Sequence, residues 1–224
     1  MKFEKTEVWG FEHALRGMRN PLESWEKSDT RMLLTNKNNT WQEDARIGVN
    51  DLELAQRLIK AGEPHRKFLR QIIISVDITA PLYWWKEFDT YKVGMVANST
   101  STMHKLASTP ITINCFEMDD FENLEGNFLV QDNGTDDVDG VWYELIENLE
   151  WLRQKYNETK DKRYWKELIR LLPESWLQTR TVTMNYENVL NMIKYRINHK
   201  LVEWSSSFIN WANSLPYANE LLFL

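Results

Sequence analysis

Apolar and polar side chains alternate along parts of the chain, as they do in β-strands with one buried face. The amino-terminal stretch FEKTEVW alternates in this way, and FLRQIIISVDITAPL carries the strongest run of β-branched residues, which Pro81 should end. A further strand candidate is ITINCFEM. Residues 26–47 are polar and show no period. The pattern therefore predicts strands early in the chain.

Helical spacing of apolar residues marks most of the other segments. GFEHALRGMR predicts a helix that Pro21 stops, and VNDLELAQRLIKAG predicts one that Asn50 or Asp51 caps and Gly62 closes. LYWWKEFDTYKVGMVA also has helical spacing, whereas the hydroxyl-rich NSTSTMHKLASTP predicts a loop. The carboxyl-terminal third is predicted helical in VWYELIENLEWLRQKYNE, RYWKELIRLL, residues 185–195 and residues 201–214. Strands early and helices late favour an α+β fold.

Composition limits the class of protein. The 224 residues are 42% apolar and 27% charged and include 11 tryptophans, as in a globular protein with aromatic anchors in its core. No linker or repeat divides the sequence, so we expect a single domain over residues 1–224. The net charge of −6 argues against binding to a nucleic acid polymer or to an anionic membrane. The single cysteine, Cys115, and the lack of a secretory signal favour a cytoplasmic protein.

Acidic residues crowd the segment 118–140, which we expect to be a loop insertion. A calcium-binding loop that began at Asp132 would need ligands at its third and twelfth positions, where Gly134 and Tyr143 stand. A solvated acidic loop is therefore the prediction, and no metal site is expected. Phosphate-binding glycine loops, nucleophile elbows and the HExxH and CxxC metal motifs are also missing from the sequence.

Two blocks of the sequence carry motif-like spacings. The first is HRKFLRQIIISVDITAPLYWWKEFDTYKVGMVANSTSTMHK, from His65 to Lys105. It resembles the core of the flavin-dependent thymidylate synthases, because it keeps the spacing of that family's His-x-[Ser/Thr]-x-x-Glu-His segment, its Ala-Pro strand end and its Arg-Gln-x-x-Arg-His-Arg helix over 41 positions. The second, LLPESWLQTRTVTMNYENVLNMIKYR, keeps the spacing of Leu-Pro followed by Asn-x-Arg-x-x-x-Asn-x-x-x-x-Arg. The resemblance implies a central, mainly antiparallel sheet flanked by long helices.

The chemistry of these motifs is altered. Three arginine positions of the family hold Thr90, Thr102 and Glu187 here. A threonine offers an anion one neutral hydroxyl in place of a guanidinium fork, and loss of one such contact costs about 2–5 kcal/mol. Glu187 should repel a phosphate. Added positive charges in the same blocks compensate in part: Lys67, Arg70, Lys86 and Lys92.

The resemblance implies a site, position by position. Arg196 would polarise a pyrimidine ring and Thr100 would orient the base, so both are predicted catalytic. Predicted substrate-binding residues are Lys86, Glu87, Asn98, Thr102 and Arg170. Predicted cofactor-binding residues are His65, Arg70, Tyr91, Lys92, Asn185 and Asn191.

Simpler interpretations stay open for these residues. Arg196 fits an interhelical ion pair equally well, and residues 98–102 fit a hydrogen-bonded loop. Arg70 and Lys92 fit solvated charges. Arg16 and Arg19, near the end of the first predicted helix, fit a favourable interaction with the helix dipole.

The activity that the resemblance implies is transfer of a one-carbon unit from methylenetetrahydrofolate to C5 of dUMP. FAD would carry the hydride, NADPH would reduce the flavin, and the protein would be a homotetramer. Two alternatives remain. One is a divergent enzyme that modifies another pyrimidine nucleotide, and the other is a catalytically inactive homologue that binds a nucleotide or a protein.

Overall fold

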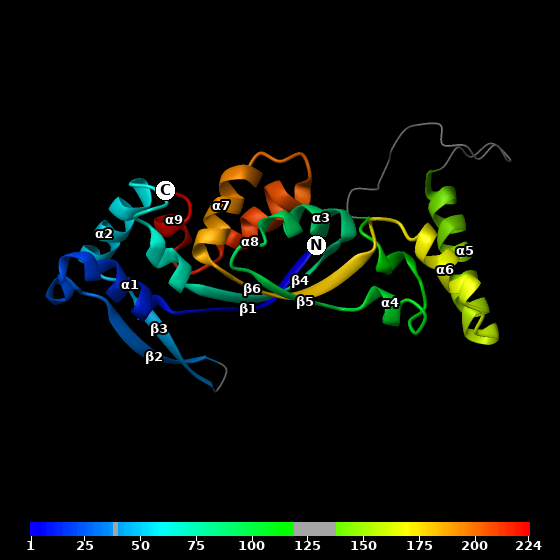
Figure 1. Cartoon of the computed structure of the whole chain (residues 1–224), viewed down its shortest axis with the longest axis horizontal. Coiled ribbons are helices and arrows are strands. Elements are labelled where there is room, and N and C mark those ends of the chain that lie inside the picture. The colour runs from blue at the N-terminus through cyan, green and yellow to red at the C-terminus, as the bar shows by residue number, and fades with distance from the viewer. Residues whose placement is uncertain (38–39, 119–137) are drawn as a thin grey trace. The chain divides into compact units, whose positions relative to one another are not determined.

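A four-stranded, mainly antiparallel sheet lies at the centre of the fold, in a computed structural model that describes residues 1–37, 40–118 and 138–224 (Figure 1). Its strands follow the order β1-β4-β6-β5. Their bounds are Lys2–Trp9 for β1, Ile73–Pro81 for β4, Val96–Ser99 for β5 and Leu177–Asn185 for β6. Along β4 every second side chain is buried, as the alternating pattern requires. The predicted α+β class and flanked antiparallel sheet are confirmed.

The chain divides into two compact units, and strands β4, β5 and β6 contribute residues to both. Unit 1 comprises Met1, Thr79–Asp89 and Asn98–Arg180. Unit 2 comprises Lys2–Ile78, Thr90–Ala97 and Thr181–Leu224. The single domain expected from the sequence stays a prediction.

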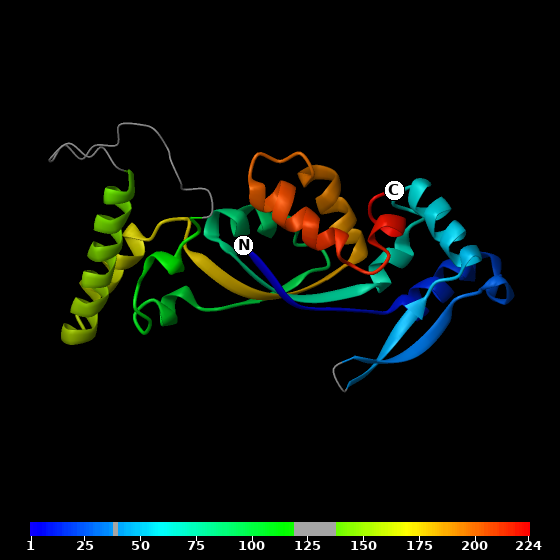
Figure 2. The ribbon, with the colours of Figure 1, turned by 180° about the vertical axis from the view of Figure 1, so that it is seen from behind.

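Unit 2 packs helices against one face of its strands, and two opposite views place α7 and α8 on the same side (Figures 1 and 2). Trp204 and Phe208 are fully buried there with their rings edge to face, 5.2 Å apart. Phe3 of β1 stacks on Trp211 at 4.7 Å. The helices of unit 2 are α1 (Phe11–Arg19), α2 (Val49–Lys60), α7 (Tyr186–Arg196), α8 (Ile209–Asn213) and α9 (Ala218–Leu221), with a π-helix at Glu203–Phe208 and 3₁₀ turns at Asn20–Leu22, Trp25–Lys27 and Lys67–Gln71.

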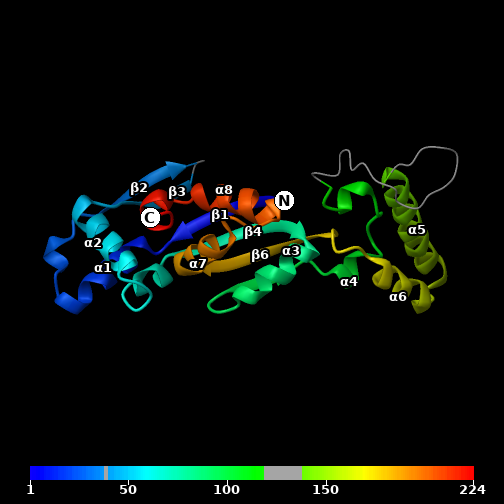
Figure 3. The same ribbon diagram turned by 90° about the horizontal axis from the view of Figure 1, so that it is seen from above.

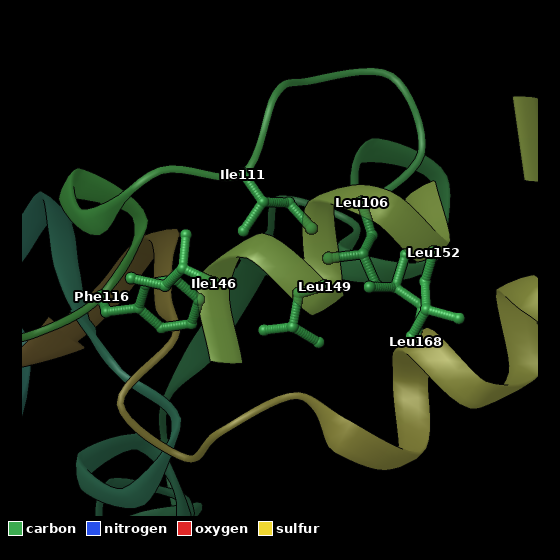
Figure 4. Packing of buried hydrophobic residues seen from close by; sticks show 7 residues of the cluster. All are labelled: Leu106, Ile111, Phe116, Ile146, Leu149, Leu152 and Leu168. Atoms are coloured by element: carbon green, nitrogen blue, oxygen red, sulfur yellow. The ribbon is translucent and has the colours of Figure 1, made fainter. Parts of the chain in front are cut away.

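Unit 1 has a hydrophobic cluster of its own. Helices α5 (Val138–Thr159) and α6 (Lys162–Leu171) lie side by side when seen from above (Figure 3). Figure 4 shows the buried side chains that join them to the preceding loop, which are Leu106, Ile111, Phe116, Ile146, Leu149, Leu152 and Leu168. The short helices of unit 1 are α3 (Leu82–Phe88), α4 (Thr102–Lys105) and a 3₁₀ turn at Ile113–Cys115, and another 3₁₀ turn, Asp89–Tyr91, spans its boundary.

Most predicted helices are confirmed, but their ends differ in places. The α2 helix is capped at Gly48, so the predicted caps at Asn50 and Asp51 are wrong, while Gly62 does end the segment at a φ of +97°. The helix predicted from residue 82 stops at Phe88, and Gly94, at a φ of +75°, turns the chain into β5. The loop predicted after it contains the end of β5 and α4.

Three strand expectations need correction. ITINCFEM forms a 3₁₀ turn and a single β-bridge between Phe116 and Trp176, so Cys115 does not lie in a strand. The polar segment 26–47 contains an antiparallel hairpin of β2 (Arg31–Lys37) and β3 (Thr40–Arg46). Strand β6 lies in the third of the chain that was predicted helical.

Arg19 also differs from its expected role. Its side chain is only 4% exposed, and its Nε lies 2.6 Å from Oδ1 of the fully buried Asp51. Arg19 is therefore the cation of a buried ion pair between α1 and α2, a stronger interaction than the expected one with the helix dipole.

Residues 119–137 of the acidic segment lie outside the described residues, so the loop and calcium expectations for them stay predictions. Residues 138–140, expected to belong to the same loop, instead begin α5. Within the described part of the chain, no cluster of three or more His, Cys, Asp or Glu side chains could hold a metal ion. Nor does any helix in that part have the length and apolar character needed to cross a membrane.

Candidate functional site

A cavity of about 670 Å³ opens in unit 2 between α1, α2 and the 3₁₀ turn Lys67–Gln71. Basic side chains predominate among its charged lining residues, and we call it the basic cavity: Arg19, Lys27, Arg57, His65 and Lys67, with one acid, Glu26. Leu54, Leu58 and Phe68 supply apolar wall. Its size and mixed lining are typical of a small-molecule site.

Three cations of the basic cavity are available to a ligand. Lys27, Arg57 and Lys67 are exposed, and no carboxylate within the described residues forms an ion pair with them. Arg19 is different, because Asp51 neutralises it. Burial raises the pKa of Asp51, but hydrogen bonds from Thr30, Ser28 and Arg19 outweigh burial and leave this pKa below its ordinary value.

The backbone explains how the walls of the basic cavity meet. Gly17 of α1 faces Gln71, and a Cβ at this glycine would lie 2.7 Å from Oε1 of that side chain. A larger residue at this position would displace the end of the Gln71 side chain, so the glycine lets α1 and Gln71 meet without that shift. After Gly62 ends the α2 segment, the chain reverses and brings His65 to the cavity.

Glu187, expected to repel phosphate, is already neutralised. Arg66 donates through Nε and Nη2 to its carboxylate, at 3.0 Å for each bond, and through Nη2 to Asn191 Oδ1 at 3.1 Å. Glu187 is 4% exposed, so this is a bidentate ion pair with little access to water. The expectation of repulsion from Glu187 is therefore wrong for this arrangement, and the predicted cofactor residue Asn191 has its amide oxygen engaged.

Arg196 lies in an aromatic environment within unit 2. Its Nε donates to the Tyr91 hydroxyl at 2.9 Å, and its guanidinium carbon lies 4.8 Å from the centre of the buried Trp204 ring. Cation–π contacts of this kind hold a guanidinium in a fixed position. The structure thus brings together two predicted residues, Tyr91 and Arg196, as hydrogen-bond partners.

Two predicted residues of unit 1, the catalytic candidate Thr100 and the substrate candidate Thr102, contact side chains and backbone of β6. Thr100 donates its backbone N–H to the Thr179 carbonyl at 2.8 Å, and its hydroxyl accepts from the Thr179 N–H at 3.3 Å. Gln178 donates to the Thr100 carbonyl at 3.0 Å and to the Thr102 hydroxyl at 3.3 Å. The structure therefore brings Thr100 and Thr102 together through one glutamine.

Exposed ion pairs hold three other predicted residues. Lys86 pairs with Glu174 at 2.6 Å, Arg170 with Glu167 at 2.9 Å and Arg70 with Glu63 at 2.9 Å. Such surface pairs exchange readily for a ligand anion, because they contribute little stability.

The remaining predicted residues divide by exposure. Asn185 is buried and forms a reciprocal capping box with Asn188 at the start of α7. Glu87 is partly buried, and Lys92 and Asn98 are exposed. Neither unit alone holds all the predicted residues. Unit 2 holds His65, Arg70, Tyr91, Lys92, Asn185, Asn191 and Arg196, and unit 1 holds Lys86, Glu87, Asn98, Thr100, Thr102 and Arg170.

Sequence reasoning missed the partners of the motif residues. Arg66 follows a predicted cofactor residue directly, and Arg180 interrupts a run of hydroxyl and apolar residues in TRTVTM. A charge at an otherwise uncharged strand position is a signal that could have identified Arg180, because such a charge needs a partner when it is partly buried.

Comparison with solved structures defines the fold. Over its whole length the chain matches the flavin-dependent thymidylate synthase ThyX of Helicobacter pylori complexed with FAD and dUMP, with a TM-score of 0.66 and 18% sequence identity, covering 98% of that protein. A second structure of the same enzyme with FAD and dUMP matches equally well and is covered over 97% of its length. No protein-family model and no curated protein matches the sequence. The chain therefore has the fold of the flavin-dependent thymidylate synthases, and at this level of identity the likeness concerns the fold alone.

Proposed function

We propose that this protein is a flavin-dependent thymidylate synthase-like enzyme that binds a pyrimidine nucleotide. Its reaction would transfer a one-carbon unit from methylenetetrahydrofolate to C5 of dUMP, with NADPH as the reductant. The observation that carries the proposal is a basic cavity with His65 at its wall, in a chain whose entire length takes the fold of ThyX. The proposal includes the homotetramer that the resemblance implies.

Arg196 supports the nucleotide part of this proposal. Charge that develops on a pyrimidine during attack at its C5–C6 bond is stabilised best by a cation that does not have to reorganise. The Tyr91 hydroxyl and the Trp204 ring hold the Arg196 guanidinium in one place. Arg196 would polarise the ring, and Thr100 would orient the base.

The resemblance implies FAD as the cofactor, and the described residues suit the pyrophosphate part of FAD better than its flavin ring. The basic cavity suits its pyrophosphate, which Lys27, Arg57, His65 and Lys67 would hold. The flavin ring fits less well, because Asn185 and Asn191, which were expected beside it, already bond to Asn188 and Arg66. When bound, FAD would supply the hydride. The residues of the chain would bind and orient it.

Spectroscopy and titration test the proposal. The protein purified from cells should be yellow or should bind added FAD, and it should bind dUMP in calorimetry. Arg196→Ala should lower dUMP affinity about tenfold or more, the effect of one charge-assisted contact. The matched control is Arg163→Gln, because Arg163 is 91% exposed on α6 and should leave affinity unchanged. Colourless protein that binds neither FAD nor dUMP would refute the proposal, and rescue of a thymidine auxotroph would establish the reaction.

A second candidate is an inactive homologue that binds a nucleotide without flavin chemistry. The Arg66–Glu187 ion pair favours it, because a carboxylate stands where the family places a cation and the local guanidinium is occupied. Saturable dUMP binding without FAD binding and without rescue would select this candidate. Saturable binding of a different pyrimidine nucleotide, with dUMP inert, would instead select the divergent enzyme.

A further inference from the structure

Two side chains of β6, Gln178 and Arg180, contact residues of unit 1 on either side of the stretch 90–99. Arg180 donates through Nη1 to Asp89 Oδ1 at 2.8 Å and through Nε to Gln178 Oε1 at 3.0 Å. Gln178 in turn donates through Nε2 to the Thr100 carbonyl at 3.0 Å and to the Thr102 hydroxyl at 3.3 Å. Because the amide oxygen of Gln178 accepts from a cation, its NH₂ group must face the two threonines.

Arg180 is itself firmly held. Its guanidinium carbon lies 4.2 Å from the centre of the Trp85 ring, and the side chain is 15% exposed. Trp85 is 1% exposed, and its Nε1 donates to the Gln178 carbonyl at 2.9 Å. A planar guanidinium suits this combination of stacking and directed hydrogen bonds, whereas a lysine cannot reproduce it.

The segments that this connection joins flank residues 90–99. Asp89 precedes that stretch, and Thr100 follows it. Between them lie Tyr91, Lys92 and Asn98, three of the residues that the family resemblance predicts to bind ligands. Position 180 is not among the family motif positions that predicted the site.

We propose that Arg180 is a positioning residue, which acts through Gln178 and Asp89 to fix both ends of the predicted ligand-binding stretch 90–99. The part of this inference that concerns ligands rests on the proposed function. The structural part does not, because it concerns only how firmly residues 98–106 are held in the protein without a ligand.

Amide hydrogen exchange on the full-length protein tests the structural part. The reporters are the backbone amides of Thr100, Lys105 and Leu106, which bond to Thr179, Ser101 and Thr102 respectively. In Arg180→Met these amides should exchange about tenfold faster, as after loss of one charge-assisted hydrogen bond. Gln178→Glu keeps an acceptor for Arg180 but loses the donor to the threonines, so it should show the same local effect. Amides of α7 should not change in either variant.

Calorimetry with dUMP tests the functional part. The dissociation constant should rise about tenfold in Arg180→Met and in Gln178→Glu, while the melting temperature stays within a few degrees of the wild type. Arg180→Lys should be intermediate, because it keeps the charge without the fork. The exposed Arg163→Gln should match the wild type in both measurements.

The outcomes separate the two proposals. Unchanged exchange at residues 98–106, or faster exchange throughout the chain including α7, would overturn the positioning role. If the wild type does not bind dUMP, the proposed function fails, while the exchange measurement still decides what Arg180 positions. Local loosening with full dUMP affinity would refute the functional part alone.

Discussion

Replacing Asp51 by alanine should be among the most destabilising single changes at a polar side chain in this protein. Asp51 is fully buried, and its Oδ1 lies 2.6 Å from Nε of Arg19, which is 4% exposed. Its other oxygen, Oδ2, accepts from the Ser28 hydroxyl at 2.7 Å and from the Thr30 hydroxyl at 2.6 Å. The variant Asp51→Ala leaves a buried guanidinium without its counter-ion.

The expected loss follows from that uncompensated charge. Removal of one partner from a buried ion pair costs about 3–5 kcal/mol of unfolding free energy. For a chain of this size each kcal/mol shifts the melting temperature by about 2–4 °C, so a decrease of about 6–20 °C is expected. Equilibrium urea unfolding, with far-UV circular dichroism as the signal, measures the free energy directly. The double variant Arg19→Met/Asp51→Leu should recover part of the loss, because it removes both charges.

The pH dependence provides an independent check. Because the folded pKa of Asp51 lies below its ordinary value, its ionised form stabilises the fold above the unfolded pKa, and this stabilisation is lost as pH falls through the folded pKa. Asp51→Asn should therefore show a shallower decline of stability in acid than the wild type. The control is Lys155→Gln, since Lys155 forms an exposed pair with Glu158 and should change stability by less than about 1 kcal/mol. If Asp51→Ala lost less than about 1 kcal/mol of unfolding free energy, as the control should, the reasoning would be refuted.

Three further predictions concern separate features. Gly10→Ala should lower the unfolding free energy measured in urea by more than about 2 kcal/mol. The residue has a φ of +94°, and a Cβ would clash with a backbone carbonyl of the turn Lys67–Gln71. Wild-type stability of this variant would contradict the prediction. A hydrogen bond from Arg153 lowers the pKa of Glu150 from 4.5 to about 2, so the ionised carboxylate stabilises the fold and this stabilisation is lost as pH falls through that range. Glu150→Gln should therefore remove a step between pH about 4.5 and about 2 from the acid unfolding profile. Glu187→Gln should release Arg66 and tighten binding of inorganic phosphate in calorimetry, whereas unchanged phosphate affinity would show that Arg66 does not face a ligand.

Periodicity predicted the elements that bury one continuous apolar face. The β-branched run of β4 and the amphipathic helices α1, α2, α5 and α6 depend on local patterns, which tertiary contacts only reinforce. Periodicity failed for segments whose polar side chains are covered by partners from other elements. Strand β6 reads as polar, because its hydroxyl and charged side chains pair with neighbouring strands and with α3, as Thr179 does with Thr79 at 2.7 Å.

In the candidate site, too, the sequence predicted the positions of residues but not their interaction partners. Motif spacing predicted the stretches in which ligand residues would lie, and one of the predicted residues, His65, lines the basic cavity. It could not show that Arg66 would neutralise Glu187, because the two are 121 positions apart and neither charge alone specifies the other. A lost arginine at one position is therefore weak evidence for a lost anion site, since a guanidinium elsewhere in the chain can return to the same place. The Glu187→Gln titration separates two roles of Arg66: tighter phosphate binding assigns its guanidinium to a ligand, and unchanged binding assigns it to Glu187 alone.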